Sequence, residues 1–302
     1  MSRVFVAGSI NMDVVAKTKH HPSPGETILG TELRFIPGGK GANQALASSK
    51  LGMETLLIGS VGADAFGAEL LSFLKQSKLD IKQVKQVEET TTGTALIVVN
   101  SIGENTIVVV PGANACLEPA DVLSTGCTRD DILVAQFETP LSTTIAFFQY
   151  GKSQGTTNIL NPAPAQKVPA ELLALSDVVV LNTTELSLLT GEKITSESAA
   201  DCCKKLQVSS EQVVVLTLGR DGVVAVAGSR IIREQGHDVK AIDTTGAGDC
   251  FVGALASRLA LGMPIDQSIA FANKAAAISV QRFGAGTSMP TLQEVELFQT
   301  RK

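Results

Sequence analysis

The chain has 302 residues, 44% of them hydrophobic and 18% charged, a composition that supplies a sizeable core and is unlike that of a disordered chain. The formal net charge of −5 gives no basic footprint for nucleic acid, and with no Trp and one Tyr the chain offers few platforms for base stacking. We therefore expect small-molecule partners, with no nucleic acid and no membrane among them.

The five cysteines are an odd number without metal-ligand spacing, which favours a reducing compartment over a disulfide framework. The N-terminus begins with a strand-like run over residues 3–10, not with a basic and then apolar signal segment. No apolar run approaches the length that spans a bilayer. These features predict a soluble, cytoplasmic protein.

Strand-like and helix-like segments alternate along most of the chain. Residues 4–7, 132–135, 178–181 and 213–216 are continuous apolar runs, typical of strands covered on both faces. The last three are each followed by a helix-compatible stretch, and apolar side chains repeat at helical spacing over residues 66–74 and 265–276. The pattern predicts an α/β fold with a Rossmann-type, mainly parallel sheet and helices on both faces.

Two stretches break the alternation. Residues 12–36 are rich in Pro, Gly, Thr and charge, and residues 93–110 read as two strands joined by a turn at 103–105. We expect a small β-sheet that stands off the main body and serves as a lid, an oligomer interface or both; the alternative is an ordinary edge hairpin. No repeat or linker divides the chain, so residues 1–302 are predicted to form one domain with a discontinuous lid.

Polar or Gly-rich turns follow the predicted strands, where a parallel sheet gathers its ligands at one edge. In the first, residues 8–13, Asn11 and Asp13 alternate and offer hydrogen-bonding partners for vicinal hydroxyls, although turn chemistry is the alternative. In the second, residues 37–44 enter a helix and resemble a phosphate loop. The Walker spacing fails, because Arg34 and Gly41 stand where Gly and Ser or Thr are required.

Three further turns complete the set. Glu138 follows the strand at 132–135, and Asn182 opens a helix in which Glu185 completes a capping box, a role that is compatible with ligand binding. Thr217, Gly219 and Gly222 form a tight turn after the next strand. The convergence of these turns predicts an active site.

Residues 243–249 (DTTGAGD) combine an acidic residue, a Gly-rich turn and the start of a helix. Gly246 and Gly248 allow several backbone N–H groups to approach an anion at the positive end of that helix. Asp249, in the first turn, is placed to take a proton from a hydroxyl that attacks a phosphoryl group. The alternative is an Asp that only stabilises the helix N-terminus. The three histidines form no catalytic triad, and a dinucleotide GxGxxG fingerprint is absent.

Over nearly its whole length the chain resembles the ribokinase (PfkB) family of carbohydrate kinases. Both signatures of that family are present, at residues 38–44 and 243–249, and the segments 8–13, 161–164 (NPAP) and 182–185 (NTTE) match as well. The resemblance implies a ribokinase-like fold and a kinase that uses ATP, Mg²⁺ and a monovalent cation, usually K⁺. Thr183 departs from the pattern, because relatives commonly carry an acidic residue there.

The resemblance also assigns roles by position. Asp249 is implied as the catalytic base, and the backbone of Gly246, Ala247, Gly248 and Asp249 as the anion hole. The implied sugar ligands are Asn11, Asp13, Gly39, Lys40, Asn43, Glu138 and Asp249. The implied ATP site comprises Asn182, Glu185, Thr217, Gly219, Gly222, Gly248 and Asn273, with Glu185 acting on Mg²⁺ indirectly. The implied K⁺ site comprises Asp243, Thr245, Ser279, Arg282, Gly284 and Ser288, several of them through backbone carbonyls.

The implied reaction is transfer of the γ-phosphoryl group of ATP to O5 of D-ribose, and the implied assembly is a homodimer formed through the lid. Kinases of the same family for 2-deoxyribose, another furanose or a nucleoside are the first alternatives. A non-catalytic sugar or nucleotide sensor on the same fold is the second, and a nicotinamide-dependent enzyme is the third.

Overall fold

The computed structural model describes residues 2–298 of the chain. In that range the strands are β1 (Val4–Ala7), β2 (Asn11–Lys17), β3 (Glu32–Gly38), β4 (Thr55–Gly62), β5 (Asp80–Val87), β6 (Gly93–Val99), β7 (Asn105–Val110), β8 (Ile132–Ala135), β9 (Thr157–Leu160), β10 (Val178–Asn182), β11 (Val213–Thr217), β12 (Val223–Ala227) and β13 (Arg230–Glu234). The α-helices are α1 (Lys40–Lys50), α2 (Ala65–Lys75), α3 (Pro119–Val122), α4 (Leu141–Gln154), α5 (Ala170–Leu175), α6 (Thr183–Thr190), α7 (Ala199–Leu206), α8 (Ala247–Ala260), α9 (Ile265–Ser279) and α10 (Leu292–Leu297). Short 3₁₀ helices are η1 (Gly112–Cys116), η2 (Gly219–Asp221) and η3 (Gly286–Ser288).

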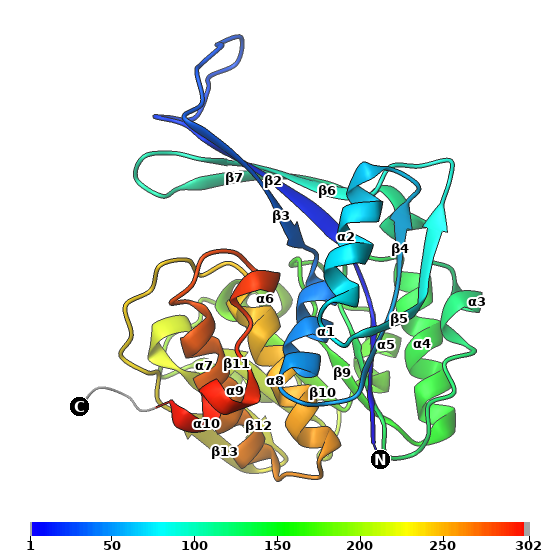
Figure 1. Cartoon of the computed structure of the whole chain (residues 1–302). Helices are drawn as coiled ribbons and strands as arrows, with labels where there is room; N and C mark the ends of the chain where they lie inside the picture. Colours follow the sequence, from blue (N-terminus) through cyan, green and yellow to red (C-terminus); the bar gives the residue numbers. More distant parts are fainter. Residues whose placement is uncertain (1, 299–302) are drawn as a thin grey trace.

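The described strands form a nine-stranded sheet in the order β13-β12-β11-β10-β9-β8-β1-β4-β5 and a four-stranded sheet in the order β3-β2-β6-β7. Neighbours from β11 to β5 are parallel. Figure 1 shows helices on both faces of the large sheet and the small sheet projecting above the body. The predicted α/β class, with its mainly parallel sheet and helices on both faces, is confirmed.

The central strands of the large sheet are buried on both faces, because β1 and β8 carry apolar residues at every position and β10 carries them from Val178 to Leu181. In β1, Val4 and Val6 join the core that contains α1, α8 and α9, whereas Phe5 packs on the opposite face with Phe147 and Phe148 of α4. The same alternation places Val178 of β10 in the first core and its neighbour Val179 against α6 and α7. The continuous apolar runs of the sequence therefore have a direct structural cause.

One expectation about this sheet is wrong. The strand at 213–216 is not followed by a helix: the chain turns through η2 and Gly222 into β12, which pairs antiparallel with β11, and β13 pairs antiparallel with β12. Gly222, at φ +97°, makes the tight reversal possible, and the ideal position of a Cβ there lies 2.0 Å from the Glu234 carbonyl oxygen.

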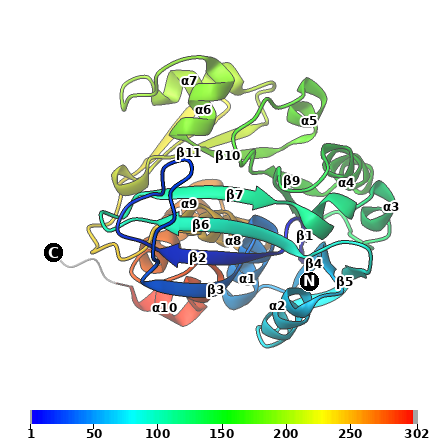
Figure 2. The ribbon, with the colours of Figure 1, turned by 90° about the horizontal axis from the view of Figure 1, so that it is seen from above.

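The small sheet predicted from the two unusual stretches is present. Seen from above, β3, β2, β6 and β7 lie side by side across the top of the body (Figure 2). One row of opposed residues consists of Val14, Phe35, Leu96 and Val108. The neighbouring row on the other face includes Asp13 and Val109, which line a pocket. One face of the small sheet thus forms a wall of this pocket.

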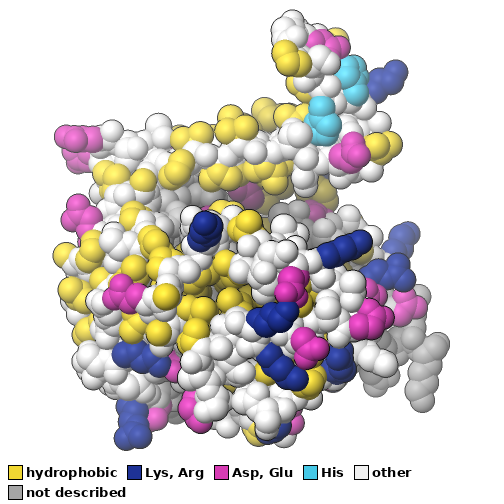
Figure 3. Space-filling model, turned by 180° about the vertical axis from the view of Figure 1, so that it is seen from behind, with side chains coloured by type: hydrophobic (Ala, Val, Ile, Leu, Met, Phe, Trp, Pro, Cys, Tyr) yellow, Lys and Arg dark blue, Asp and Glu magenta, His cyan; other side chains and the backbone are white. Residues whose placement is uncertain are grey.

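The other face of the small sheet carries apolar side chains that remain exposed. Phe35 is 50% exposed, Leu96 48% and Val108 61%. The view from behind shows apolar side chains along this sheet and a hollow between it and the body (Figure 3). No helix within residues 2–298 combines the length and the apolar character needed to cross a membrane.

Candidate active site

Three adjoining pockets lie at the carboxyl edge of the large sheet. The small-sheet pocket, about 730 Å³, lies between the small sheet and the body. The junction pocket, about 170 Å³, shares Lys40, Gly246 and Asp249 with it. The outer pocket, about 250 Å³, shares Thr217 and Gly248 with the junction pocket. Asp249 therefore borders two of the pockets, and the junction pocket shares lining residues with both of the others.

The small-sheet pocket contains the polar side chains predicted from the first two turns and from Glu138. Its lining includes the polar residues Asn11, Asp13, Lys40, Asn43, Glu138 and Asp249, together with Gly39. The side chain of Asn11 is held from behind by Asn114, whose Nδ2 donates to Asn11 Oδ1 at 2.7 Å. Asn114 also accepts from the Ile10 backbone N–H at 2.9 Å, so it fixes the segment that carries Asn11. Sequence reasoning missed Asn114, which resembles an ordinary turn residue in η1.

The N-terminus of α1 organises the same pocket. Glu138 Oε2 accepts from the Lys40 backbone N–H at 3.2 Å and from the Ser9 hydroxyl, so a carboxylate lies at the positive end of the helix. Gly39 caps this helix at φ +90°, and a Cβ there would lie 2.7 Å from the Asn11 backbone nitrogen. Only glycine fits this position without displacing the segment that presents Asn11.

Asp249 lies in the first turn of α8 and is 7% exposed. Its Oδ2 accepts from Asn43 Nδ2 and its Oδ1 from Gln44 Nε2, both at 3.0 Å. Gly246 begins the helix in the left-handed region, and a Cβ on Gly248 would meet no atom of residues 2–298 within 4 Å. The carboxylate thus stands beside an open helix N-terminus, the arrangement expected for an anion cradle.

Four carboxylates surround one lysine in this region. Burial, with help from the nearby Glu138 and Asp249 carboxylates, raises the pKa of Asp13 to about 7, while Lys40 opposes that rise. Burial alone would lower the pKa of Lys40, but the surrounding carboxylates raise it above its ordinary value. Lys40 therefore stays charged, and Asp13 is poised to change its protonation near neutral pH.

The junction pocket is formed where β10 meets α6. Asn182 caps α6: its Oδ1 accepts from the Glu185 backbone N–H at 2.9 Å, and Glu185 Oε2 accepts from the Asn182 backbone N–H at 2.8 Å. The predicted capping box is therefore confirmed, and both residues also line the pocket. Burial raises the pKa of Glu185, against the opposing effects of the hydrogen bond from Asn182 and the charge of Lys40.

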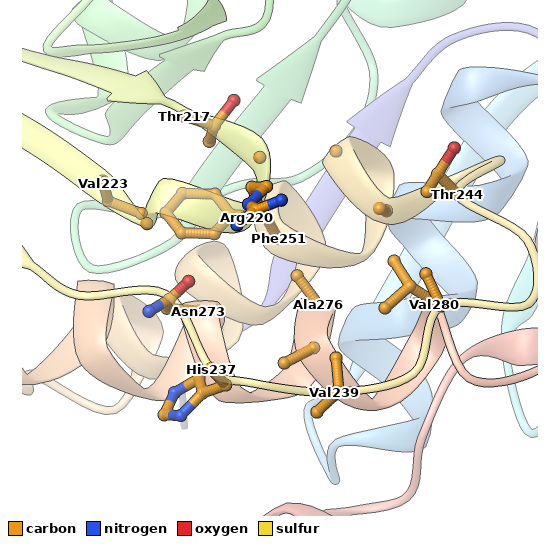
Figure 4. Close-up of a pocket in the computed structure, with 16 residues that line it drawn as sticks. Thr217, Arg220, Val223, His237, Val239, Thr244, Phe251, Asn273, Ala276 and Val280 are labelled. Carbon is orange, nitrogen blue, oxygen red and sulfur yellow. The ribbon is translucent and has the colours of Figure 1, made fainter. Parts of the chain in front are cut away.

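The outer pocket has largely apolar walls. Figure 4 shows side chains from the β11–β12 turn on one side, among them Thr217 and Arg220, and from α9 on the other, among them Asn273 and Ala276. Gly219 and Gly222 belong to the same lining. Asn273 is oriented by donating from Nδ2 to the Gln235 carbonyl oxygen at 2.8 Å. A largely apolar pocket with a few polar groups suits a flat heterocyclic ring.

Asp243 ties together two loops beside the N-terminus of α8. Its Oδ1 accepts from the Thr245 backbone N–H at 2.9 Å, and its Oδ2 accepts from the Gly284 backbone N–H at 3.0 Å. The hydroxyls of Ser279 and Ser288 donate to backbone carbonyls of their own segments. Arg282 turns away, to an ion pair with Glu294, so its side chain contributes no contact to Asp243.

Comparison with known proteins agrees with this geometry. The profile of the pfkB family of carbohydrate kinases matches residues 1–292. The chain belongs to this family. It is 38% identical over 299 residues to the ribokinase of Staphylococcus aureus, an alignment that covers 97% of this chain and 98% of the relative.

Solved structures of pfkB-type kinases share the same fold. The ribokinase of Thermotoga maritima superposes with a TM-score of 0.86 at 35% identity, covering 98% of each chain. Arabidopsis thaliana ribokinase complexed with ribose and ATP superposes with a TM-score of 0.87 at 32% identity, covering 99% of this chain and 100% of that one. The family predicted from the two signature segments is confirmed.

Proposed function

We propose that the protein transfers the γ-phosphoryl group of ATP to O5 of D-ribose, giving D-ribose 5-phosphate and ADP. The observation that carries this proposal is the position of Asp249, which borders both the small-sheet pocket and the junction pocket at the N-terminus of α8. A base at that boundary can face a sugar hydroxyl on one side and a phosphoryl group on the other. The relationship to kinases of known activity supports the same reaction.

The sugar occupies the small-sheet pocket in this proposal. Asn11 and Asp13 project from alternate positions of β2 into that pocket and present donors and acceptors to vicinal hydroxyls. Lys40 and Asn43 contribute from the first turn of α1, and Glu138 contributes from the end of β8. Asn43 already contacts Asp249 at 3.0 Å, so it links the sugar ligands to the base.

In this mechanism the phosphoryl group passes directly from ATP to the sugar, and the protein forms no covalent bond with it. Asp249 accepts the proton of the O5 hydroxyl while the bond from O5 to the γ-phosphorus forms and the bond from that phosphorus to the β,γ-bridging oxygen breaks. ADP leaves with the electron pair of the broken bond. Backbone N–H groups of Gly246, Ala247 and Gly248, together with Lys40, stabilise the charge on the transferring group. Positioning and electrostatics supply most of the acceleration.

The nucleotide is proposed to extend from the junction pocket into the outer pocket. Thr217 and Gly248 line both pockets, so they lie between the site proposed for the phosphates and the site proposed for the adenine ring. Asn182 borders the phosphates, while Gly219, Gly222 and Asn273 surround the base. The apolar wall formed by Ala276 and Val280 suits a purine ring.

The residues of the junction pocket fit Mg²⁺ as a partner of the phosphates. Both oxygens of Glu185 already accept hydrogen bonds from Asn182, which favours an indirect role through water. Within residues 2–298 no three His, Cys, Asp or Glu side chains group closely enough to hold a metal. When bound, Mg²⁺ offsets negative charge on the phosphate oxygens.

The loops joined by Asp243 fit a monovalent cation. Its carboxylate uses one lone pair of each oxygen on a backbone N–H, which leaves acceptor capacity for a cation alongside backbone carbonyls. The proposed donors come from Asp243, Thr245, Ser279, Arg282, Gly284 and Ser288, with Arg282 contributing only its carbonyl. Because Thr245 precedes Gly246, a cation here would stabilise the turn that opens the anion hole.

The small sheet is proposed to act as a lid and as a dimer interface. Its inner face closes the small-sheet pocket, and closure over the sugar would exclude water and limit hydrolysis of ATP. Its outer face exposes the row of Phe35, Leu96 and Val108, an apolar surface suited to pairing with the same surface of a second copy.

A parallel substrate panel tests the function. Steady-state assays with ribose, 2-deoxyribose, fructose and adenosine, each with and without K⁺, are expected to give the highest kcat/KM for ribose and higher rates with K⁺. A higher kcat/KM for one of the other acceptors would reassign the substrate within the family. Absence of phosphoryl transfer to all four, with retained nucleotide binding, would favour a sensor.

A further inference from the structure

A connected set of buried side-chain amides lies behind Asp249. Gln44 Nε2 donates to Asp249 Oδ1 at 3.0 Å, and Gln44 Oε1 accepts from Gln136 Nε2 at 2.7 Å. Both glutamines are fully buried, at 0% exposure. Neither lines any of the three pockets described above. Their influence on the reaction therefore passes through the side chains that Gln44 contacts, Asp249 and Asn161.

The hydrogen bonds fix the orientation of the Gln44 side-chain amide. An ionised carboxylate only accepts, so Gln44 must turn its NH₂ group toward Asp249. The same NH₂ group donates to Asn161 Oδ1 at 3.0 Å, and Asn161 is itself fixed by donating to the Val180 carbonyl oxygen at 2.9 Å. A reversed Gln44 amide would bring its oxygen against two other oxygens. The arrangement is therefore matched to the ionised form of Asp249.

The hydrogen bond from Gln136 to Gln44 leaves the amide oxygen of Gln136 unpaired. Its Oε1 is buried without a hydrogen-bond partner among the residues that the structure describes. That oxygen lies 2.1 Å from the ideal position of a Cβ on Gly8, so a side chain at residue 8 would displace it. A buried carbonyl left unpaired lowers the stability of the folded state.

We propose that Gln44 and Gln136 are positioning residues for the catalytic base. Asn43 holds Oδ2 of Asp249 and Gln44 holds Oδ1, so two amides fix the plane of the carboxylate. Gln136 fixes Gln44 in turn. The inference rests on the proposed kinase function, in which Asp249 must face O5 in its ionised form. It adds two residues that contact neither the sugar nor the nucleotide.

Substitution by methionine tests this role, because methionine has a similar shape and removes the amide. In Gln44→Met we expect kcat to fall by roughly ten- to a hundredfold, with the KM values for ribose and ATP changed by less than about threefold. Gln136→Met should show the same selectivity with a smaller loss.

Gln212 provides a matched control. It is 2% exposed and directly precedes β11, so it lies at the opposite end of that strand from Thr217; its Nε2 donates to the carbonyl oxygens of Leu173 and Ser176. Gln212→Met should therefore lose comparable stability in thermal unfolding without a specific loss of kcat per folded molecule. A kcat loss in Gln44→Met no greater than in this control would overturn the proposal.

Two further measurements separate positioning from general damage. In an Asp249→Asn background, Gln44→Met should cause little additional loss, because the group it positions is gone; full additivity would contradict the proposal. A crystal structure of Gln44→Met should show the Asp249 carboxylate rotated or in two conformers, and an unchanged carboxylate would also contradict it. This structural result does not depend on turnover. If the parent protein were inactive with every sugar, the proposed function would be refuted. The crystal structure of Gln44→Met would still decide whether Gln44 positions the Asp249 carboxylate.

Discussion

The region around Asp249 and the small sheet above it hold their side chains in different ways. Asp249 is 7% exposed and receives hydrogen bonds from two amides, one of them fully buried. In the small sheet, by contrast, every residue of β7 is exposed, and Val108 is 61% exposed. Chemistry at the first region depends on fixed geometry, whereas the second is suited to move or to meet a partner. Substitutions in the two regions should therefore have different consequences.

The largest effect is expected at Asp249. In Asp249→Ala the proton acceptor is lost, so kcat should fall by about 10²- to 10⁴-fold or more, while ATP binding stays close to that of the parent. Stopped assays of ribose phosphorylation and calorimetric titration of ATP would measure the two properties. Asp266→Ala is the matched control, since Asp266 is an exposed carboxylate in the first turn of α9. If Asp249→Ala behaved like this control, Asp249 would only stabilise its helix.

The second-largest difference between the two regions is expected when a glycine of each is replaced by alanine. Gly39 and Gly103 share a positive φ, at +90° and +86°. A Cβ at Gly39 would meet the Asn11 backbone nitrogen at 2.7 Å, whereas one at Gly103, in the β6–β7 turn, would meet no atom of residues 2–298 within 4 Å. Gly103→Ala should thus cost about 1 kcal/mol of unfolding free energy, from strain alone.

Gly39→Ala should cost several times more, about 3 kcal/mol, and should raise the KM for ribose because the collision displaces Asn11. Urea unfolding and ribose kinetics on both variants measure this difference. Equal costs at the two positions would mean that the segment around Asn11 adapts easily, contrary to the rigid geometry inferred here.

Local sequence patterns were sufficient to predict most of the architecture. The run at 178–181 lies within β10, since a strand covered on both faces needs apolar residues throughout. The Asn182–Glu185 capping box follows from spacing alone, because both of its hydrogen bonds are local. The antiparallel edge was missed because an apolar run does not specify whether a helix or a tight turn follows it.

Contacts within the site were less accessible to sequence reasoning. Gln44 lies within a recognised motif, but its partner Gln136 is 92 residues away and its partner Asp249 is 205 residues away. Asn114 contacts Asn11 across 103 residues. Spacing does not reveal such pairs, since they arise only when the strands and helices pack together. The turns identified the residues that line the pockets but not the side chains that hold them in place.

A smaller, pH-dependent effect is expected at Asp13. Its pKa is raised from 3.8 to about 7, so the folded state binds this proton more tightly than the unfolded state between those pH values. Stability is therefore lost as pH rises through that window, and the loss levels off only above the folded-state pKa of about 7. Asp13→Asn removes the buried charge and should stabilise the sugar-free protein by about 1–2 kcal/mol at pH 8.

The benefit of Asp13→Asn should diminish toward pH 4, where the parent side chain is also neutral. Urea unfolding from pH 5 to 8 measures this dependence, with Asp130→Asn at an exposed position as the control. The same variant should bind ribose more weakly, because an acceptor for its hydroxyls is lost. A stability difference that did not change with pH would show that Asp13 is not buried as a charge.

The smallest effect on folding is expected on the outer face of the small sheet. Val108→Glu should leave the unfolding free energy within about 0.5 kcal/mol of the parent value, because the side chain is already 61% exposed. It should nevertheless convert the proposed dimer to a monomer, since a charge would be buried where two apolar rows meet. Leu188→Glu, at a 52% exposed apolar position on α6, should leave the dimer intact. Sedimentation at micromolar concentration distinguishes the two variants, and a monomeric parent would show that this face serves only as the outside of a lid.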